Sequence, residues 1–215
     1  MNTRPPPAAR RPRAGFTLIE LLTVISIIGI LAAILIPTIS MAIRRAQESK
    51  TKIQLQNLVS MCEMYHDSYK VWPTFSTRVT TQKDTSFRLK DNAPRFVRIM
   101  TGKPDSGDNQ YNKLGVAFAT FKDGDLTNDP ESVTPIDSFG NDDLFLVFNT
   151  NLSDQGHIMP EIINEVSMES HEGTMVGIKQ NESIPVNASC VALSPGAGRN
   201  DMDAITTWDV KAPSD

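Results

Sequence analysis

Residues 13–36 read R-A-G-F-T-L-I-E-L-L-T-V-I-S-I-I-G-I-L-A-A-I-L-I, and this stretch decides how the chain is organised. From Phe16 to Ile36, a run of 21 residues, Glu20 is the single charged side chain. As an α-helix the run would be about 31 Å long, which matches the hydrocarbon thickness of a bilayer. A buried helix of a globular domain is rarely so long or so apolar on every side. The run therefore predicts a membrane-spanning helix.

A basic leader precedes this run. Residues 1–15 contain four arginines, four prolines and no acid, so they predict neither a helix nor a core. Arginines beside a membrane span favour its cytoplasmic side. Basic residues also follow the span, however, so charge alone leaves the orientation open. They are Arg44, Arg45, Lys50 and Lys52.

The overall composition limits the possible functions. The chain has 215 residues, 40% hydrophobic and 21% charged, as expected for one folded domain or two small ones. A net charge of -4 gives no sign of a nucleic-acid-binding surface, and two cysteines are too few for a zinc module or a disulfide scaffold. The sequence has no P-loop, Gly-x-Ser-x-Gly or His-Glu-x-x-His pattern, so no catalytic activity is expected.

After Pro37 the apolar pattern becomes one-sided. Apolar residues mostly follow steps of three or four, which predicts an amphipathic helix that continues the span to Tyr69. Pro73 disfavours helix at the residue before it and is expected to end the helix. The predicted stripe consists of Ile39, Ile43, Ala46, Ile53, Leu58, Cys62 and Tyr65.

Residues 74–215 predict a small α+β head. A short helix is expected over 94–102, and strands are expected over 114–121, 144–148, 174–178 and 188–193. The predicted fold is a long N-terminal helix packed on a small antiparallel sheet. Cys62 lies on the helix and Cys190 on a predicted strand. In an oxidising compartment they could bond, although two buried free thiols are the favoured interpretation.

The segment from Arg13 to Glu20, followed by an apolar helix, resembles the N-terminal signal of type IV pilins and type II secretion pseudopilins. The resemblance implies that a prepilin peptidase cuts after Gly15 on the cytoplasmic face and methylates the new amine of Phe16. It also implies four parts: a cleaved leader (1–15), a transmembrane helix (16–36), an amphipathic stalk (37–73) and a periplasmic head (74–215).

Glu20 is the exceptional residue of the span. An acid at the centre of a membrane helix costs about 2.5–3.5 kcal/mol, and less near an end, so such a residue usually has a partner. Cleavage at Gly15 would create an amine on Phe16. The resemblance implies that the amine of one subunit neutralises Glu20 of its neighbour during assembly. The alternative is a carboxylate solvated at the membrane surface.

Two segments of the head extend the resemblance, to the major pseudopilin in particular. The first is Asp137-Ser-Phe-Gly140 with the strand after it, and the second is the loop from Ser194 to Trp208. In major pseudopilins the second loop binds calcium, which implies Asp201 and Asp203 as carboxylate ligands here. Backbone carbonyls and water would complete the six to eight oxygens that calcium prefers. The alternative is an ordinary solvated acidic loop.

The expected function is structural. The chain resembles a subunit that assembles through its N-terminal helix into a type II secretion pseudopilus and supports protein export. Its implied partners are further copies, other pseudopilins, the prepilin peptidase, the secretion assembly platform and the inner membrane, with the head in the periplasm. A type IV pilin subunit is one alternative, and a membrane-anchored binding or enzymatic domain is the other.

Overall fold

The computed structural model describes residues 16–75, 83–122, 124–129, 132–151, 156–199 and 203–210. It divides into two compact units, Met1–Arg44 and Arg45–Asp215. The predicted leader 1–15, including Gly15, lies outside the described residues, as does Asp201.

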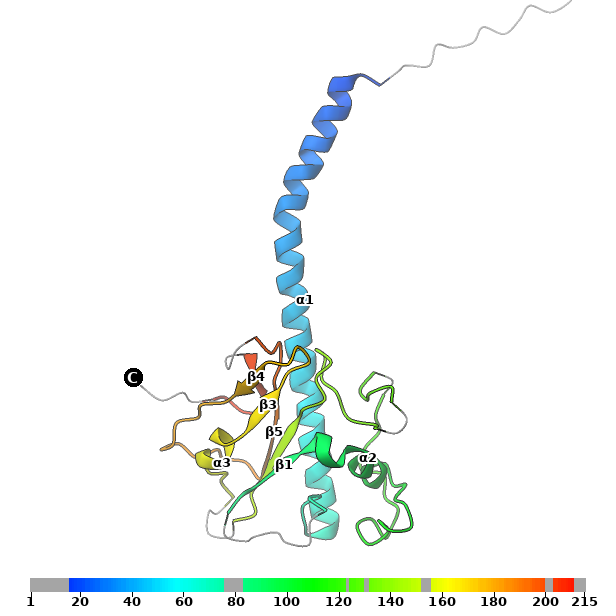
Figure 1. The fold of residues 1–215 in the computed structure, drawn as a ribbon, viewed down its shortest axis with the longest axis vertical. Helices are drawn as coiled ribbons and strands as arrows, with labels where there is room; N and C mark the ends of the chain where they lie inside the picture. The colour runs from blue at the N-terminus through cyan, green and yellow to red at the C-terminus, as the bar shows by residue number, and fades with distance from the viewer. Residues whose placement is uncertain are drawn as a thin grey trace, which may run out of the picture. The chain divides into compact units, whose positions relative to one another are not determined.

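Helix α1 runs from Leu18 to Tyr69, 52 residues without interruption (Figure 1). Its end at Tyr69 confirms the prediction. Lys70 follows with a φ of 58°, a left-handed conformation that a helix cannot continue through. Among the described helices, α1 is the one that is long and apolar enough to cross a membrane.

The second unit contains two antiparallel sheets. The larger has the order β1-β2-β5-β6, and the smaller pairs β3 with β4. In the larger sheet, Phe148 of β2 pairs with Thr85 of β1 and with Cys190 of β5. The strands are β1 (Thr85–Arg88), β2 (Phe145–Phe148), β3 (Ser167–Glu169), β4 (Met175–Gly177), β5 (Cys190–Ser194) and β6 (Ile205–Thr206).

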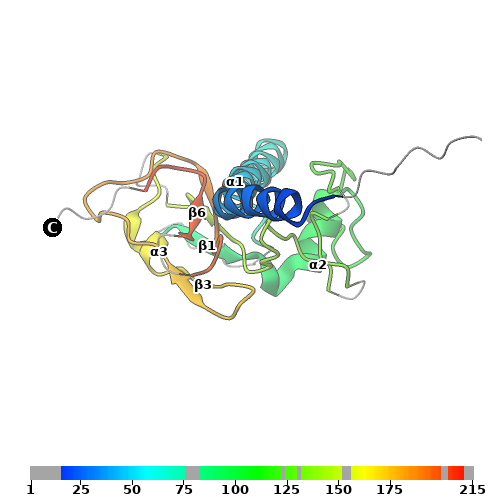
Figure 2. The ribbon, with the colours of Figure 1, turned by 90° about the horizontal axis from the view of Figure 1, so that it is seen from above.

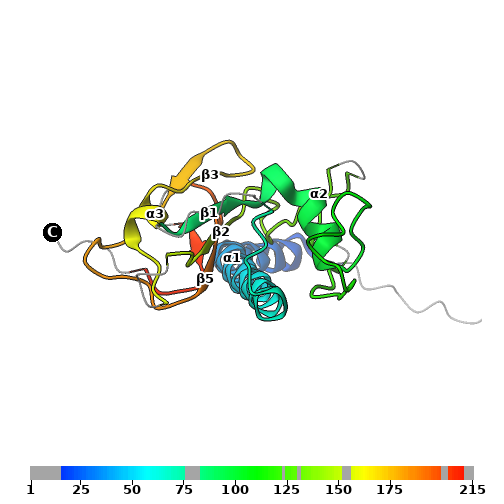
Figure 3. The same cartoon turned by 90° about the horizontal axis from the view of Figure 1, so that it is seen from below.

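The two faces of the larger sheet bury different cores. Because side chains alternate along a strand, Leu146 and Phe148 of β2 face the core that α1 contributes to, together with Cys190 and Ala192 of β5. The intervening residues, such as Val147, face a second core with Ile163 of α3 (Pro160–Asn164) and with β3 and β4. In Figures 2 and 3, α3 and β3 lie to one side of the part of α1 that belongs to the second unit, and α2 lies to the other.

The helix presents a narrower stripe to this sheet than the sequence predicts. Leu58, Cys62 and Tyr65 are buried as expected, whereas Ile53 and Ala46 are exposed. Ile53 precedes Leu58 by five residues, which places it about 140° round the helix. The buried residues of α1 are Thr51, Leu55, Leu58, Cys62 and Tyr65.

The prediction of a strand over 114–121 is wrong. The segment lies beside the end of helix α2 (Leu89–Met100), where the backbone N–H groups of Phe118 and Ala119 donate to the carbonyl of Met100 at 2.8 and 2.9 Å. The last carbonyls of a helix have no partner within it. The segment therefore caps α2 instead of joining a sheet.

The other predicted elements are confirmed with shifted bounds. The expected strands over 144–148, 174–178 and 188–193 are β2, β4 and β5, and the helix expected over 94–102 is α2. Helix α2 begins earlier than expected and contains a kink at Asn92. Four short elements were not predicted: β1, α3, β3 and β6.

The stripe makes a direct prediction for stability. Leu55→Ala should lower the free energy of unfolding by about 2–5 kcal/mol, because Leu55 is fully buried between α1 and the sheet. Ile53→Ala, two residues away and 55% exposed, should cost less than about 1 kcal/mol. Urea unfolding of the detergent-solubilised protein, followed by tryptophan fluorescence, measures both values. Equal costs for the two variants would contradict the assigned stripe.

Candidate functional site

The N-terminal end of α1 is closed by a reciprocal pair of hydrogen bonds. Glu20 Oε2 accepts from the Thr17 N–H at 2.8 Å and from Thr17 Oγ1 at 2.7 Å. The Glu20 N–H in turn lies 3.3 Å from Thr17 Oγ1. This is a capping box, in which Thr17 is the N-cap and Glu20 the third helical residue.

Thr17 is a residue that the sequence analysis missed. The signal was present, since Thr-x-x-Glu before an apolar run is the sequence pattern of a capping box. Phe16 directly precedes the cap and is exposed. An amine created on Phe16 would therefore stand one residue from the Thr17–Glu20 pair.

The other polar side chains of the apolar run are satisfied by the helix itself. Thr23 Oγ1 donates to the Glu20 carbonyl at 3.0 Å, and Ser26 Oγ donates to the Leu22 carbonyl at 2.8 Å. Such bonds to the preceding turn let hydroxyl groups enter an apolar environment. The Glu20 charge is then the feature of this helix that most needs a partner.

The surface of this run is apolar on all sides. Each of its large apolar side chains is about half or more exposed. Together they form a contiguous apolar surface larger than a water-soluble protein normally exposes. Lipid or neighbouring helices must cover such a surface. The residues are Leu18, Ile19, Leu21, Leu22, Val24, Ile25, Ile27, Ile28, Ile30, Leu31, Ile34, Leu35 and Ile36.

In the head, a buried carboxylate joins the two segments that carry the pseudopilin resemblance. Asp137 accepts from the N–H groups of Phe139 and Asn141 at 2.8 and 2.9 Å, and from Asn141 Nδ2 at 2.6 Å. The Ser194 hydroxyl, at the end of β5, also donates to it. Burial raises the pKa of Asp137, and these four hydrogen bonds oppose the rise.

A second hydrogen bond between the two loops is made by Asn141. Its side-chain amide donates to the Gly196 carbonyl at 2.7 Å. Gly196 has a φ of +60°, and a Cβ added there would lie 1.9 Å from the Asp203 carbonyl oxygen. Only glycine fits this close approach. The loop after Asp137 and the C-terminal loop are thus held together by protein groups.

The described residues supply one carboxylate of the predicted calcium site. Asp203 lies beside Gly196, and its Oδ2 accepts from the Arg199 N–H at 2.9 Å. Within the described ranges there is no group of three or more His, Cys, Asp or Glu side chains that could hold a metal ion. Because Asp201 falls outside these ranges, the calcium site stays a prediction.

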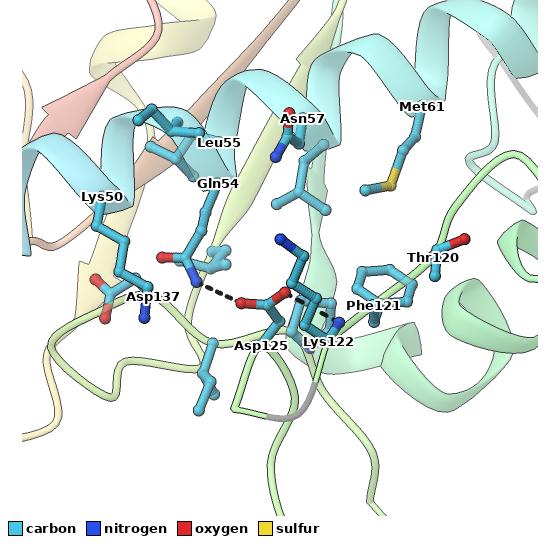
Figure 4. A pocket seen from close by; sticks show the side chains of 15 residues that line it. Lys50, Gln54, Leu55, Asn57, Met61, Thr120, Phe121, Lys122, Asp125 and Asp137 are labelled. Atoms are coloured by element: carbon cyan, nitrogen blue, oxygen red, sulfur yellow. Dashed lines mark hydrogen bonds between the residues drawn. The ribbon is translucent and has the colours of Figure 1, made fainter.

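A groove lies beside α1 within the second unit (Figure 4). Gln54 points into it and donates to Asp125 at 2.9 Å. The volume of about 230 Å³ is below the range of roughly 300–1,000 Å³ that is usual for small-molecule sites. The residues described around it include no histidine, serine or cysteine.

Comparison with known proteins finds similarity that includes the N-terminal region. Residues 10–36 match the family model of the prokaryotic N-terminal methylation motif. The chain is 36% identical to the type IV major pilin protein PilE of Neisseria gonorrhoeae over 88 residues, which are 41% of this chain and 52% of that protein. It is 51% identical to the type IV wide pilus major component PilA4 of Thermus thermophilus over 55 residues, 26% of this chain and 42% of that protein.

A third relative is a fimbrial protein of Neisseria meningitidis serogroup B, 34% identical over 88 residues, 41% of this chain and 51% of that protein. The chain thus spans about half the length of the curated relatives it matches. No solved structure matches.

These matches and the geometry support a type IV pilin-like protein: residues 10–36 carry the methylation motif, and a long helix packs on a small antiparallel sheet. The three named relatives are a type IV major pilin protein, a type IV wide pilus major component and a fimbrial protein. The narrower expectation of a type II secretion pseudopilin receives no specific support from them.

The Asp137 network predicts a stability difference between two neighbouring acids. Asp137→Ala should lower the free energy of unfolding by roughly 2–4 kcal/mol, because it leaves buried donors without an acceptor. Asp142→Ala is the matched control, since Asp142 pairs with Lys90 at a partly exposed site and should cost less than about 1 kcal/mol. Chemical denaturation of the two variants checks this order, and an equal loss would contradict it.

The same carboxyl predicts a pH dependence. Folding raises the pKa of Asp137 above its ordinary value of 3.8. At pH values between the ordinary and the raised pKa, the folded state therefore holds a proton that the unfolded state has released. Its contribution to stability is therefore present at low pH and lost as pH rises through the raised pKa. Asp137→Asn should remove this component. The unfolding free energy of the wild type minus that of the Asp137→Asn variant, measured from pH 3 upward, should fall; a rising difference would contradict the assignment.

Proposed function

We propose that this chain is a structural filament subunit, anchored in a membrane by residues 16–36 and polymerised through the same helix. The observation that carries the proposal is the methylation motif over residues 10–36, which includes an all-round apolar helical segment with one capped charge at Glu20. The same helix continues as an amphipathic stalk, and the folded head follows it in the sequence. This arrangement suits a subunit that presents its head along a fibre.

Processing is the first step of the proposed function. A prepilin peptidase would cut after Gly15 on the cytoplasmic face and methylate Phe16. The basic leader would leave with the cut, and the remaining chain would span the inner membrane once, with its head in the periplasm. This orientation agrees with arginines that stay in the cytoplasm until cleavage.

Assembly is the second step. In the capping box Glu20 accepts hydrogen bonds from Thr17, and no basic side chain among the described residues forms an ion pair with it. In a low-dielectric bundle of helices the remaining charge stays costly. The amine of Phe16 on a neighbouring subunit supplies the missing charge, so the pair forms only when helices pack side by side. We infer that this pairing selects subunits for assembly.

Two filament systems fit this mechanism. The pilin relatives favour a type IV pilus, whereas the resemblance of the Asp137 and C-terminal loops favours a type II secretion pseudopilus. In the second system the partners would be other pseudopilins and the secretion assembly platform. Deletion of the gene separates the two: loss of surface filaments from the sheared fraction supports a pilus, and retention of exported proteins in the periplasm supports a pseudopilus. A deletion strain normal in both assays would contradict filament function.

Gly15 determines processing in this account. Gly15→Leu should leave the leader attached, because a bulky side chain blocks a site that accepts a residue without one, whereas Gly15→Ala should still be cut. Intact mass of the protein isolated from membranes distinguishes the two states. Normal removal of the leader from the Gly15→Leu variant would contradict the assigned cleavage site.

Glu20→Gln isolates the charge from the cap. Glutamine can still accept from Thr17, so the helix should insert and stay capped. Without the negative charge the neighbouring Phe16 amine has no partner, and incorporation into filaments should fall at least tenfold. The measurement is the amount of variant in sheared filaments or cross-linked multimers from cells that lack the wild-type protein.

Thr17→Val is the matched control for that variant. It removes the hydroxyl of the cap and keeps the Glu20 charge, so assembly should be affected much less than in Glu20→Gln. If Thr17→Val blocked assembly and Glu20→Gln did not, capping rather than charge pairing would be the role of Glu20.

We also propose that the C-terminal loop binds calcium through Asp201 and Asp203. Support comes from the resemblance of the loop and from the position of Asp203 beside a tightly packed Gly196. A cation bound only by the folded state adds about 2.7 kcal/mol at a hundredfold excess over its Kd. The detergent-solubilised protein should melt higher in calcium than in chelator, and Asp201→Asn with Asp203→Asn should abolish the difference. Identical melting of the wild type in both conditions would contradict calcium binding.

A further inference from the structure

The two cysteines of the chain, Cys62 and Cys190, face one another across the interface between α1 and the larger sheet. Both are buried and free. Cys62 belongs to the buried stripe of α1, between Leu58 and Tyr65. Cys190 is the first residue of β5, on the face that turns toward this stripe.

Separate observations place the two side chains together. Both belong to the core between α1 and the sheet, and Phe148, the partner of Cys190 in β2, belongs to it as well. The residues next to them are also joined, since Ser189 Oγ donates to Glu63 Oε1 at 2.8 Å. The Cys62 thiol is also close enough to Cys190 to contribute to the raised pKa of the Cys190 thiol.

We propose that Cys62 and Cys190 are a disulfide-forming pair, which locks the stalk of α1 to strand β5 when the head meets an oxidising disulfide. The oxidant is a disulfide of a thiol–disulfide exchange protein or of glutathione. Its S–S bond breaks, the bond between Cys62 Sγ and Cys190 Sγ forms, and the two thiol protons and two electrons pass to the oxidant, which leaves as two thiols. The cellular part of this inference rests on the proposed function, which places the head outside the cytoplasm.

The bond has a clear mechanical consequence. In a filament held together by its N-terminal helices, tension reaches each head through the interface between α1 and the sheet. Among the described residues, packing and side-chain hydrogen bonds such as that between Ser189 and Glu63 hold this interface. A covalent link between its centre and β5 would prevent the stalk from separating from the sheet under load.

Burial determines when the bond can form. Burial, with the neighbouring Cys62, raises the pKa of the Cys190 thiol well above its ordinary range. Thiolates are the attacking species in exchange, so the folded head should react slowly. Oxidation should be much faster while the chain folds, before α1 packs on the sheet.

The test uses the purified full chain in detergent, refolded from urea with either oxidised glutathione or a reductant. After oxidative refolding, maleimide labelling in denaturant should find no free thiol, and the mass should fall by two hydrogen atoms. The melting temperature should rise by roughly 5–15 °C relative to the reduced protein. Cys62→Ala with Cys190→Ala is the matched control and should melt at the same temperature in both conditions.

Two free thiols in a protein that has refolded in oxidant would overturn the proposal, as would a glutathione adduct on one cysteine instead of an internal bond. In cells, thiols are trapped by alkylation before lysis. A bonded pair in the mature protein supports the proposal, and free thiols in assembled filaments would overturn it while the proposed function stands. Failure of processing or assembly would instead remove the proposed function and leave the result with purified protein unchanged.

Discussion

The burial of one stripe of α1 on one face of the larger sheet is the interaction on which the head depends. Leu55, Leu58, Cys62 and Tyr65 meet the side chains that alternate inward from β2 and β5. The opposite face of the same strands buries a second core against α3, β3 and β4. Because β2 and β5 serve both cores, the stripe also positions the loops at their ends, including those that meet at Asp137.

The N-terminal part of α1 has the opposite requirement, because its apolar surface is exposed. From Leu18 to Ile36 its apolar side chains are exposed around the whole helix, and its hydroxyl groups are satisfied within the helix. Such a segment is stable only where lipid or other helices cover it. The hydrogen bonds of Glu20 cap its own helix, and the proposed pairing of its charge with a neighbouring amine would leave this cap in place. In the proposed function, one helix is therefore a membrane anchor, an assembly surface and the support of a folded head.

The sequence predicted the parts of this fold that local rules determine. The end of α1 at Tyr69 follows from the Trp72-Pro73 pair. Strands β2 and β5 lie in largely apolar runs, as expected of strands that are buried on both faces. The segment 114–121 has a similar composition, but its backbone bonds to Met100, a tertiary contact that no local pattern reveals. The predicted stripe passes from Ala46 to Ile53 and then to Leu58, whereas the buried stripe runs through Thr51, Leu55 and Leu58. Strands as short as β3 and β6 carry no pattern at all, since two or three residues cannot display a period.

The candidate site also has residues that the sequence reveals and a contact that it does not reveal. Phe16 and Glu20 could be singled out because a lone charge in an apolar run is visible in sequence, and Thr17 was equally visible as part of a capping box. The tie from Asp137 to Ser194 joins residues 57 positions apart, so sequence could mark both loops but not their contact.

A helical reconstruction of the filaments, purified from cells that make this chain, tests the central claim most directly. The account predicts that residues 16–36 of the subunits pack side by side at the centre of the fibre. Each Glu20 should lie within ion-pair distance of the Phe16 amine of a neighbour. Subunits joined through their heads alone, or an intact leader preceding Phe16 in the assembled fibre, would contradict it.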